Sequence, residues 1–243
     1  MSISRSDTDR LLRDQSKVSA MAAEDLRELV SGFNPSSAEE MRDFLLEIVP
    51  GLSREYGEIA ATSAAEWYEE IRGREVGGSY TGRAGTPTSD EAVEGSVRYS
   101  SRNLFGETAS TSVVVEELSS SLQRHVSYAG RETVARNVRL DPRKPRFARV
   151  PSMGENGCSW CALMGSRGFV YHTEASAGQY DSYHDNCECQ IVPQWDSESS
   201  HITGYDPDDL YEKYEAARES LGGGQAKAVA AEMRRLFPER FDH

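Results

Sequence analysis

The sequence predicts a mainly α fold, with an N-terminal bundle of long helices, a small α+β zinc-knuckle domain and C-terminal helices. Apolar residues recur at spacings of three, four and seven over most of residues 7–140, which is typical of helices with one buried face. All four cysteines lie between residues 158 and 189, where helical periodicity gives way to short extended runs. We therefore divide the chain into a helical, partner-binding region (1–140), a zinc-knuckle core (141–200) and C-terminal helices (201–243).

The first two helices are marked by their ends. A helix over residues 7–33 stops at Asn34 and the proline after it. Ser37 and Glu40 are spaced as a capping box, in which the serine hydroxyl accepts from a backbone N–H and the carboxylate reaches back to the cap. A second helix follows, and Pro50 should interrupt or kink it.

Two further helices complete the bundle. One starts after Ser89 and runs toward Phe105, and another spans residues 111–139 and ends before Pro142. His125 stands alone on this last helix beside three serines, which indicates a solvent face rather than a catalytic dyad. The helical region thus offers no catalytic constellation.

The second half of the chain is built from shorter pieces. Residues 146–151 read as an extended segment and residues 158–166 as one or two helical turns. Residues 168–171 and 189–193 read as strands, and their pairing would carry the last two cysteines back to the first two. Helices are expected over residues 208–221 and 225–236.

The cysteine pattern predicts one structural zinc ion. Cys158 and Cys161 form a C-x-x-C pair, Cys187 and Cys189 form a C-x-C pair, and His184 lies three residues before Cys187. Thiolate and imidazole are the ligands that Zn²⁺ prefers, and four of them in a tetrahedral array close a structural site. We expect Cys158, Cys161, Cys187 and either Cys189 or His184 to bind the ion, with the fifth residue beside them.

Other uses of these cysteines remain open. Two disulfides would require an oxidising compartment, but residues 1–19 carry no apolar signal-peptide core. A thioredoxin-like C-x-x-C should follow a strand in a βαβ unit, and that context is missing. Unligated thiols are the third alternative. His172 follows a short apolar run and is expected to be a strand residue rather than a ligand.

The chain is acidic overall but has one basic segment. The formal net charge is −13, so the chain should repel nucleic acid and anionic membranes, and no apolar run is long enough to span a membrane. Residues 131–149 carry seven basic and two acidic side chains. That segment is either a solvated face with salt bridges or a contact for an acidic partner or DNA phosphates. The residues expected to make this contact are Arg143, Lys144, Arg146 and Arg149.

Short motifs between residues 145 and 215 carry a family resemblance. They are Arg149-Val150-Pro151, Cys158-x-Trp160-Cys161, Ser166-Arg167-Gly168, Tyr171, Tyr183-His184-x-x-Cys187-x-Cys189, Val192-Pro193-x-Trp195 and Gly204-Tyr205-Asp206-Pro207. This combination resembles minor head proteins of the tailed phages of actinobacteria, which are related to the MuF-like head morphogenesis group. Some members are labelled capsid maturation proteases.

The resemblance implies a virion or assembly protein. Such a protein would dock near the portal inside the head, in several copies per particle, and act in head assembly or DNA delivery. Its partners would be the portal protein, other head proteins and packaged DNA, with no membrane involved, and it would pass through the host cytoplasm during assembly. The zinc would supply folding free energy that a small knuckle cannot gain from apolar burial alone.

Two alternative functions follow from the same residues. A capsid maturation protease needs a nucleophile and a base, and Cys158 with His184 or His172 would be the candidates. The chain has no G-x-S-x-G elbow and no H-E-x-x-H motif, and ligation explains these residues better, so we do not expect an enzyme.

The other alternative is a zinc-dependent nucleic-acid-binding module. Aromatic side chains near the knuckle could stack on bases while nearby arginines hold phosphates. We instead expect the aromatic residues to form the small core around the metal. The aromatic residues are Trp160, Tyr171, Tyr180 and Tyr183, and the arginines are Arg146, Arg149 and Arg167.

Overall fold

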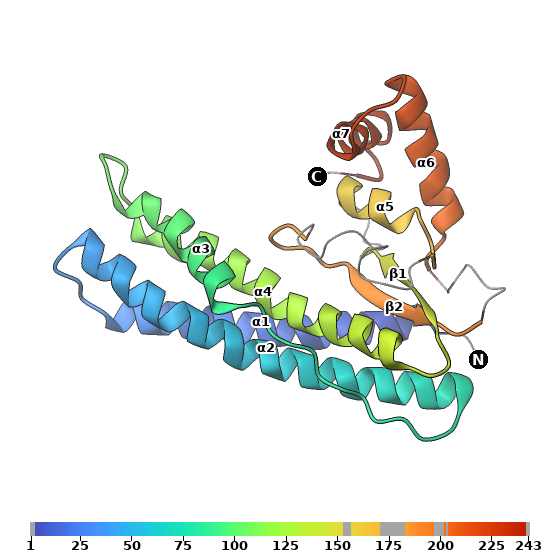
Figure 1. Cartoon of the computed structure of the whole chain (residues 1–243). Coiled ribbons are helices and arrows are strands. Elements are labelled where there is room, and N and C mark those ends of the chain that lie inside the picture. Colours follow the sequence, from blue (N-terminus) through green and yellow to red (C-terminus); the bar gives the residue numbers. More distant parts are fainter. Residues whose placement is uncertain (1–2, 153–156, 171–182, 197–201, 203, 242–243) are drawn as a thin grey trace.

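The structure, a computed structural model, describes residues 3–152, 157–170, 183–196, 202 and 204–241. It is mainly helical, with seven α-helices and a two-stranded sheet in the described part, so the predicted fold class is confirmed. Four helices form an elongated bundle, and the remaining elements gather at one end of it (Figure 1). The bundle helices are α1 (Arg5–Gly32), α2 (Ala38–Val76), α3 (Asp90–Ser100) and α4 (Thr111–Leu140), with a short 3₁₀ helix, η1 (Ser101–Leu104), after α3.

The helix ends largely follow the predicted caps. The Ser37 hydroxyl accepts from the Glu40 N–H at 3.1 Å, as expected, but the Glu40 carboxylate accepts from the backbone N–H of Ser36 at 2.7 Å rather than from Ser37. The predicted interruption at Pro50 is wrong, because α2 runs through it without a break. Pro50 is buried, and the packing of α2 against α1 and α4 outweighs the one backbone hydrogen bond that proline removes.

The bundle has a core at each end. At the end far from the sheet, α1 to α4 bury an apolar cluster that includes Leu26, Leu45, Val97 and Leu122, all fully covered. At the other end, apolar residues of α2 and α4 join those of the sheet and of the later helices in one continuous cluster. The knuckle is therefore packed on the bundle rather than tethered to it.

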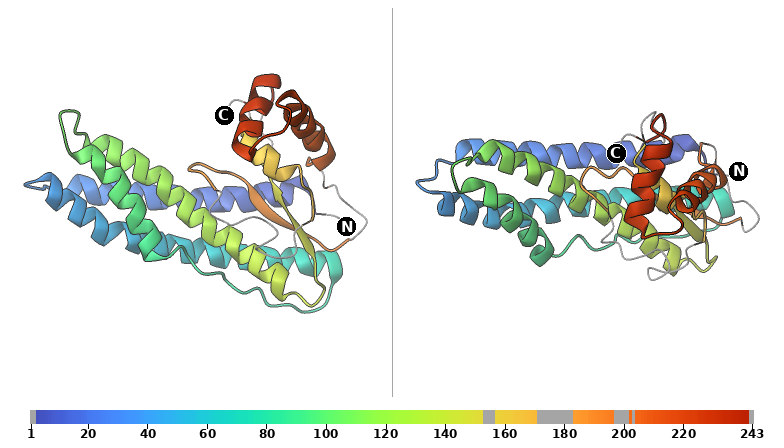
Figure 2. Two further views of the ribbon diagram at one scale, coloured as in Figure 1. Left: turned by 45° about the horizontal axis from the view of Figure 1, so that its top comes forward. Right: turned by 90° about the horizontal axis from the view of Figure 1, so that it is seen from above.

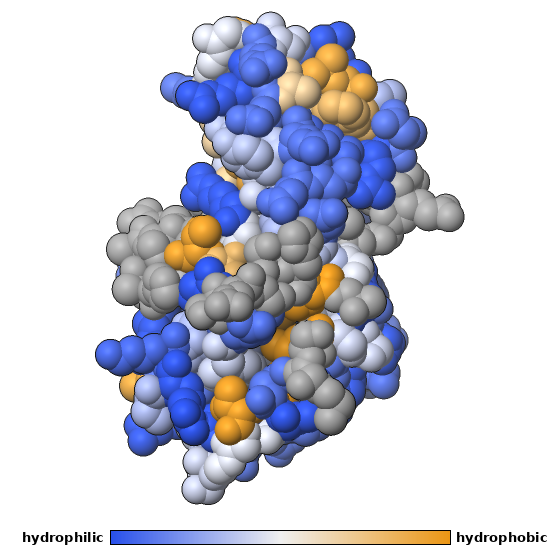
Figure 3. Space-filling view, turned by 90° about the vertical axis from the view of Figure 1, so that its right-hand side faces the viewer, coloured by the Kyte–Doolittle hydropathy of each residue, from blue (hydrophilic) through white to orange (hydrophobic). Residues whose placement is uncertain are grey.

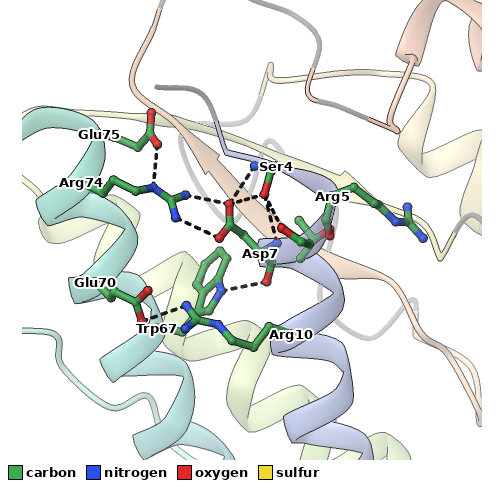
Figure 4. Close-up of polar contacts among 10 residues, drawn as sticks. Ser4, Arg5, Asp7, Arg10, Trp67, Glu70, Arg74 and Glu75 are labelled. Atoms are coloured by element: carbon green, nitrogen blue, oxygen red, sulfur yellow. Dashed lines mark hydrogen bonds and ion pairs between the residues drawn. The ribbon is translucent and has the colours of Figure 1, made fainter.

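The start of α1 is held on α2 by a network of polar contacts (Figure 4). Ser4 caps the helix, and Asp7 accepts two hydrogen bonds from the Arg74 guanidinium at 2.7 and 3.0 Å. The Trp67 indole N–H donates to the Asp7 carbonyl at 3.0 Å. The hydrogen bonds from Arg74 hold the pKa of the Asp7 carboxyl well below its ordinary value of 3.8, although burial opposes them.

The sheet pairs different segments from those expected. β1 (Arg146–Val150) runs antiparallel to β2 (Gln190–Gln194), with Ala148 opposite Val192. Residues 168–170 form no strand, so the predicted pairing of residues 168–171 with 189–193 is wrong, although Tyr171 lies outside the described residues. Gly168 has a φ of +66°, which turns the chain, and Phe169 is buried against the edge of Tyr205 instead of alternating along a strand.

Three helices lie on the side of the sheet away from the bundle. α5 (Ser159–Gly165) follows the first cysteine and packs against β1, and α6 (Pro207–Ser220) and α7 (Ala226–Leu236) form a hairpin that packs against α5 (Figure 2). After α7 the chain returns to the knuckle, where the Gly157 N–H donates to the Arg240 carbonyl at 3.0 Å and Phe241 is buried. The C-terminal residues thus hold the segment that leads into Cys158.

The surface at the knuckle end is mostly hydrophilic, with small separate apolar patches (Figure 3). None of the described helices is both long and apolar enough to cross a membrane.

Replacing Asp7 with asparagine should lower the free energy of unfolding at pH 7 by about 1–3 kcal/mol, because hydrogen bonds to a charged group are lost. The folded-state pKa of Asp7 is depressed, so its stabilisation is present above pH 3.8 and is lost as the pH falls toward the folded pKa. Urea unfolding should therefore show a smaller acid-dependent loss of stability in Asp7→Asn than in the wild-type protein. Asp9→Asn, which removes an exposed partner of Arg5, is the control and should change stability by less than about 0.5 kcal/mol. Equal acid dependence in wild type and Asp7→Asn would contradict the role of Asp7.

Candidate metal centre

All five predicted ligands converge on one place beneath α5. The Cys158 and Cys161 sulfurs lie 3.2 and 3.4 Å from His184 Nε2, and the Cys161 and Cys187 sulfurs lie 3.6 Å apart. Two groups have all their ligand atoms within 4.8 Å of one another: Cys158, Cys161 and His184 form one, and Cys161, Cys187 and Cys189 form the other. Cys161 belongs to both, so its sulfur lies at the middle of the cluster.

These separations fit a tetrahedral zinc site. With Zn–S near 2.3 Å and Zn–N near 2.0 Å, ligand atoms in a tetrahedron lie about 3.5–3.8 Å apart. The three distances from Cys161 and Cys158 are within a few tenths of an ångström of that spacing. The cluster can hold one metal ion, with Cys161 as a ligand of either possible set of four.

The four cysteines are free thiols in the structure. The 3.6 Å between the Cys161 and Cys187 sulfurs is far longer than the S–S bond of about 2.05 Å in a disulfide. The arrangement also differs from a dithiol redox pair, because four sulfurs and an imidazole share the site. The structure therefore favours the metal interpretation over the disulfide and thioredoxin-like alternatives.

Local backbone geometry explains how the ligands are presented. Cys158 caps α5, and its sulfur accepts from the Cys161 N–H at 3.5 Å, which turns both side chains to the same side. On the other segment, the Cys187 N–H donates to the His184 carbonyl at 3.2 Å across a tight turn. Asn186 adopts a φ of +60° in this turn, a conformation that asparagine tolerates better than most residues.

The pKa values of the clustered groups shift in opposite directions. Hydrogen bonding with Cys161 lowers the pKa of the Cys158 thiol to about 4, against the effect of burial, and the hydrogen bond with Cys158 raises the pKa of His184 to about 9. Burial raises the pKa of Cys189 to about 12, whereas hydrogen bonding with Cys161 lowers the pKa of Cys187 strongly. Lowered pKa values favour thiolate at Cys158 and Cys187, whereas raised pKa values favour the protonated forms of His184 and Cys189. A divalent cation would displace the protons from whichever of these groups binds it.

Two buried arginines also surround the cluster, and sequence reasoning did not identify this arrangement. Arg131 is 1% exposed and donates to the backbone carbonyls of Cys187 and, at 2.7 Å, of Cys189. Arg149 is 7% exposed and lies with a guanidinium nitrogen 3.6 Å from the Cys187 sulfur. Both arginines contact the Tyr183 ring, with guanidinium carbons 4.2 and 3.9 Å from its centre.

This arrangement corrects one expectation and agrees with another. Arg149 was expected to face an acidic partner or DNA, but its side chain points into the cysteine cluster, because both faces of β1 are covered. Tyr183 is 6% exposed and has two guanidinium groups over its ring, which agrees with the expectation that it forms part of the core rather than stacking on bases. No pattern within β1 distinguishes the buried Arg149 from the half-exposed Arg146. Trp160 is half-buried against the same core.

The other basic candidates lie at the surface. Arg143 and Lys144 are exposed in the turn after α4, where Lys144 has a φ of 49°. Arg146 is half-exposed and donates to the Asp196 carbonyl at 3.2 Å. His172, Tyr171 and Tyr180 lie outside the described residues.

His125 does not lie on a solvent face, contrary to expectation. It is 6% exposed, because α4 packs this side against α3, and its Nε2 lies 3.1 Å from the Ser96 hydroxyl. Burial lowers the pKa of His125 to about 4, with a further contribution from Arg124, so the ring is neutral at pH 7. A base with so low a pKa is poorly matched to proton transfer near neutral pH, and we interpret the contact as structural.

We expect one Zn²⁺ per chain in the purified protein, and Cys187→Ser should abolish its binding. Loss of the ion should unfold residues 150–195, because the knuckle has little core of its own, while most of the helical signal remains. Metal analysis and far-UV circular dichroism measure both effects. Sub-stoichiometric zinc in undenatured protein, together with a Cys158–Cys161 disulfide, would contradict the metal centre.

Comparison with known protein families gives one match. A family model described as VG15 protein matches residues 2–217, which include the whole bundle, the cysteine cluster and most of α6. No curated protein matches the chain, and no solved structure matches it.

Proposed function

The chain belongs to the VG15 protein family and is a phage protein, and on this premise we propose that it is a minor head protein of a tailed phage. In this proposal it docks near the portal inside the head and acts in head assembly or DNA delivery. The observation that carries the proposal is the convergence of His184 and the four cysteines in one closed cluster, because these residues form the motif that resembles MuF-like minor head proteins.

The chemistry of the cluster supports a structural role. Cys161, Cys187 and Cys189 are between 1% and 3% exposed, so a bound ion would have thiolates on its inner side and little room for substrate. A catalytic zinc site keeps one coordination position open, whereas a structural site fills all four. With five ligand candidates in reach, the cluster is suited to a closed site.

The bundle offers a surface for another head protein at its end far from the knuckle. The loop that connects α1 to α2 and the loop that precedes α4 both lie at this end (Figure 1). Leu29, Tyr99, Phe105 and Val113 flank these loops and are between 41% and 66% exposed. Exposed apolar side chains gathered in this way favour contact with a partner over contact with water.

The turn after α4 offers a second contact surface at the opposite end. Arg143 and Lys144 are exposed there, and Arg146 is half-exposed beside them. In an acidic chain these side chains would attract an acidic partner surface or packaged DNA. Arg149 takes no part, because it is buried at the cysteine cluster.

Charge reversal at this turn, Arg143→Glu with Lys144→Glu, should reduce incorporation of the protein into phage heads, and added salt should reduce the difference between the variant and the wild-type protein. Exposed charge contacts are screened within a Debye length of about 8–10 Å, so the effect should be strongest at low salt. Quantitative mass spectrometry of purified virions measures incorporation. The matched control is Arg13→Glu with Lys17→Glu, which reverses two exposed charges on α1. Equal incorporation of the variant and the control would contradict a contact at this turn.

A capsid maturation protease is the second candidate function, because Cys158 Sγ and His184 Nε2 lie 3.2 Å apart. This separation would suit a thiol nucleophile and its base. The same nitrogen, however, lies 3.4 Å from the Cys161 sulfur, and Cys161 in turn contacts Cys187. A nucleophile gains nothing from three further thiols, whereas a metal site requires them.

Phage carrying Cys158→Ala or His184→Ala separate the two functions. If the cluster only stabilises the fold, the major capsid protein should be processed as in wild type, and Cys158→Ala should lose zinc and thermal stability. Gel analysis of capsid protein from the mutant particles measures processing. Unprocessed capsid protein, in particles that contain the folded mutant, would contradict our proposal and establish the protease.

A further inference from the structure

Two arginines, one from the bundle and one from the knuckle, meet at the metal centre. Arg131 belongs to α4 of the bundle and Arg149 to β1 of the knuckle, and both are more than nine-tenths buried. Removing a guanidinium group from water is costly, so side chains in such positions are expected to meet negative charge or several acceptors. Here the acceptors come from the segment that contains the C-x-C ligands.

Arg131 acts on the backbone of that segment. Its Nε donates to the Cys189 carbonyl at 2.7 Å, and a second nitrogen donates to the Cys187 carbonyl. Gln123, two turns earlier on α4, donates from Nε2 to the same Cys187 carbonyl at 3.3 Å. The two carbonyls belong to the residues on either side of Glu188. By holding both of them, the Arg131 guanidinium fixes the backbone of the C-x-C pair and so the spacing and direction of the Cys187 and Cys189 sulfurs.

Arg149 acts on the sulfurs themselves. One of its terminal nitrogens lies 3.6 Å from the Cys187 sulfur and 3.9 Å from the Cys161 sulfur. A charged N–H group at this distance donates a weak hydrogen bond to sulfur. Arg149 therefore contacts one cysteine of the C-x-x-C pair and one of the C-x-C pair.

Tyr183 joins the two arginines. Both guanidinium groups lie over its ring, with their carbons 4.2 and 3.9 Å from the ring centre, as is typical of cation–π contacts. Tyr183 directly precedes His184, so fixing this ring also fixes the start of the ligand segment. Tyr183 and the two arginines therefore contact or adjoin the segment that carries the last three candidate ligands, His184, Cys187 and Cys189.

We propose that Arg131 and Arg149 are positioning residues that set the zinc affinity of the cysteine cluster, Arg131 by orienting the C-x-C backbone and Arg149 by donating to the ligand sulfurs. This inference rests on the proposed metal centre. Under this inference the zinc affinity depends on α4 of the bundle as well as on the residues of the knuckle. Metal binding and the docking of the knuckle onto α4 therefore stabilise each other.

The test is a zinc competition titration of the full-length protein against a chromophoric chelator. Arg131→Lys keeps the charge but cannot form the fork to two carbonyls, and it should weaken zinc binding about 10–100-fold, as is typical when a partner of metal ligands is changed. Arg149→Lys should have an effect in the same range. The matched control is Arg136→Lys, on the same helix, whose guanidinium donates to the Ala84 carbonyl at 3.1 Å and should leave zinc affinity within about twofold of wild type.

A second measurement separates positioning from general stability. Cobalt(II) in place of zinc reports the ligand geometry through its visible absorption, which a change in overall stability alone would not move. Arg131→Lys and Arg149→Lys should shift these bands, and Arg136→Lys should not. Should Arg131→Lys fail to fold, Gln123→Leu removes only one donor to the Cys187 carbonyl and should give a smaller loss of affinity in the same direction.

Folded Arg131→Lys and Arg149→Lys proteins with wild-type zinc affinity and wild-type cobalt spectra would overturn the inference while leaving the metal centre intact. Failure of the wild-type protein to bind zinc would overturn the metal centre and this inference together. Both outcomes are independent of what happens in phage particles, so neither depends on the proposed place of the protein in the head.

Discussion

The gathering of four sulfurs and an imidazole against α4 is the constraint on which the second half of this protein depends. The elements next to the ligands are a helix of 7 residues and two strands of 5 residues, too few to fold independently on apolar burial. A metal ion bound to Cys161 and its neighbours would connect α5 to the segment before β2. The buried arginines make the same connection to the bundle, because Arg131 reaches this segment from α4.

A second buried group fixes the junction between the bundle and the sheet. Asp141, 2% exposed, ends α4 and accepts from the Tyr68 hydroxyl at 3.1 Å and from the Trp195 indole at 3.0 Å. Arg72 lies 3.5 Å away, so the carboxylate has a cationic neighbour. Groups from α2, α4 and the end of β2 thus share one acceptor, and the knuckle has a defined orientation on the bundle.

The sequence was sufficient for the features that depend on local chemistry. Helix starts at Ser37 and Ser89 follow from hydroxyl caps, and the five candidate ligands follow from residue type and spacing. Features decided by long-range packing were not accessible in the same way. The partner of β2 is β1, because Phe169 fills a core position instead of alternating, and His125 and Arg149 are buried by neighbours that no local pattern identifies. Pro50 shows the same principle, since tertiary contacts keep α2 helical where the local rule predicts a break.

X-ray absorption at the zinc edge of the purified full-length protein tests the central claim most directly, because it counts the ligands and measures their distances. A four-coordinate ion with at least three sulfurs at about 2.3 Å would agree with the cluster around Cys161. A zinc shell dominated by oxygen or nitrogen would contradict it, since such a shell would place the metal elsewhere on the protein. The second half of the chain would then owe its fold to the shared apolar core and the buried arginines alone.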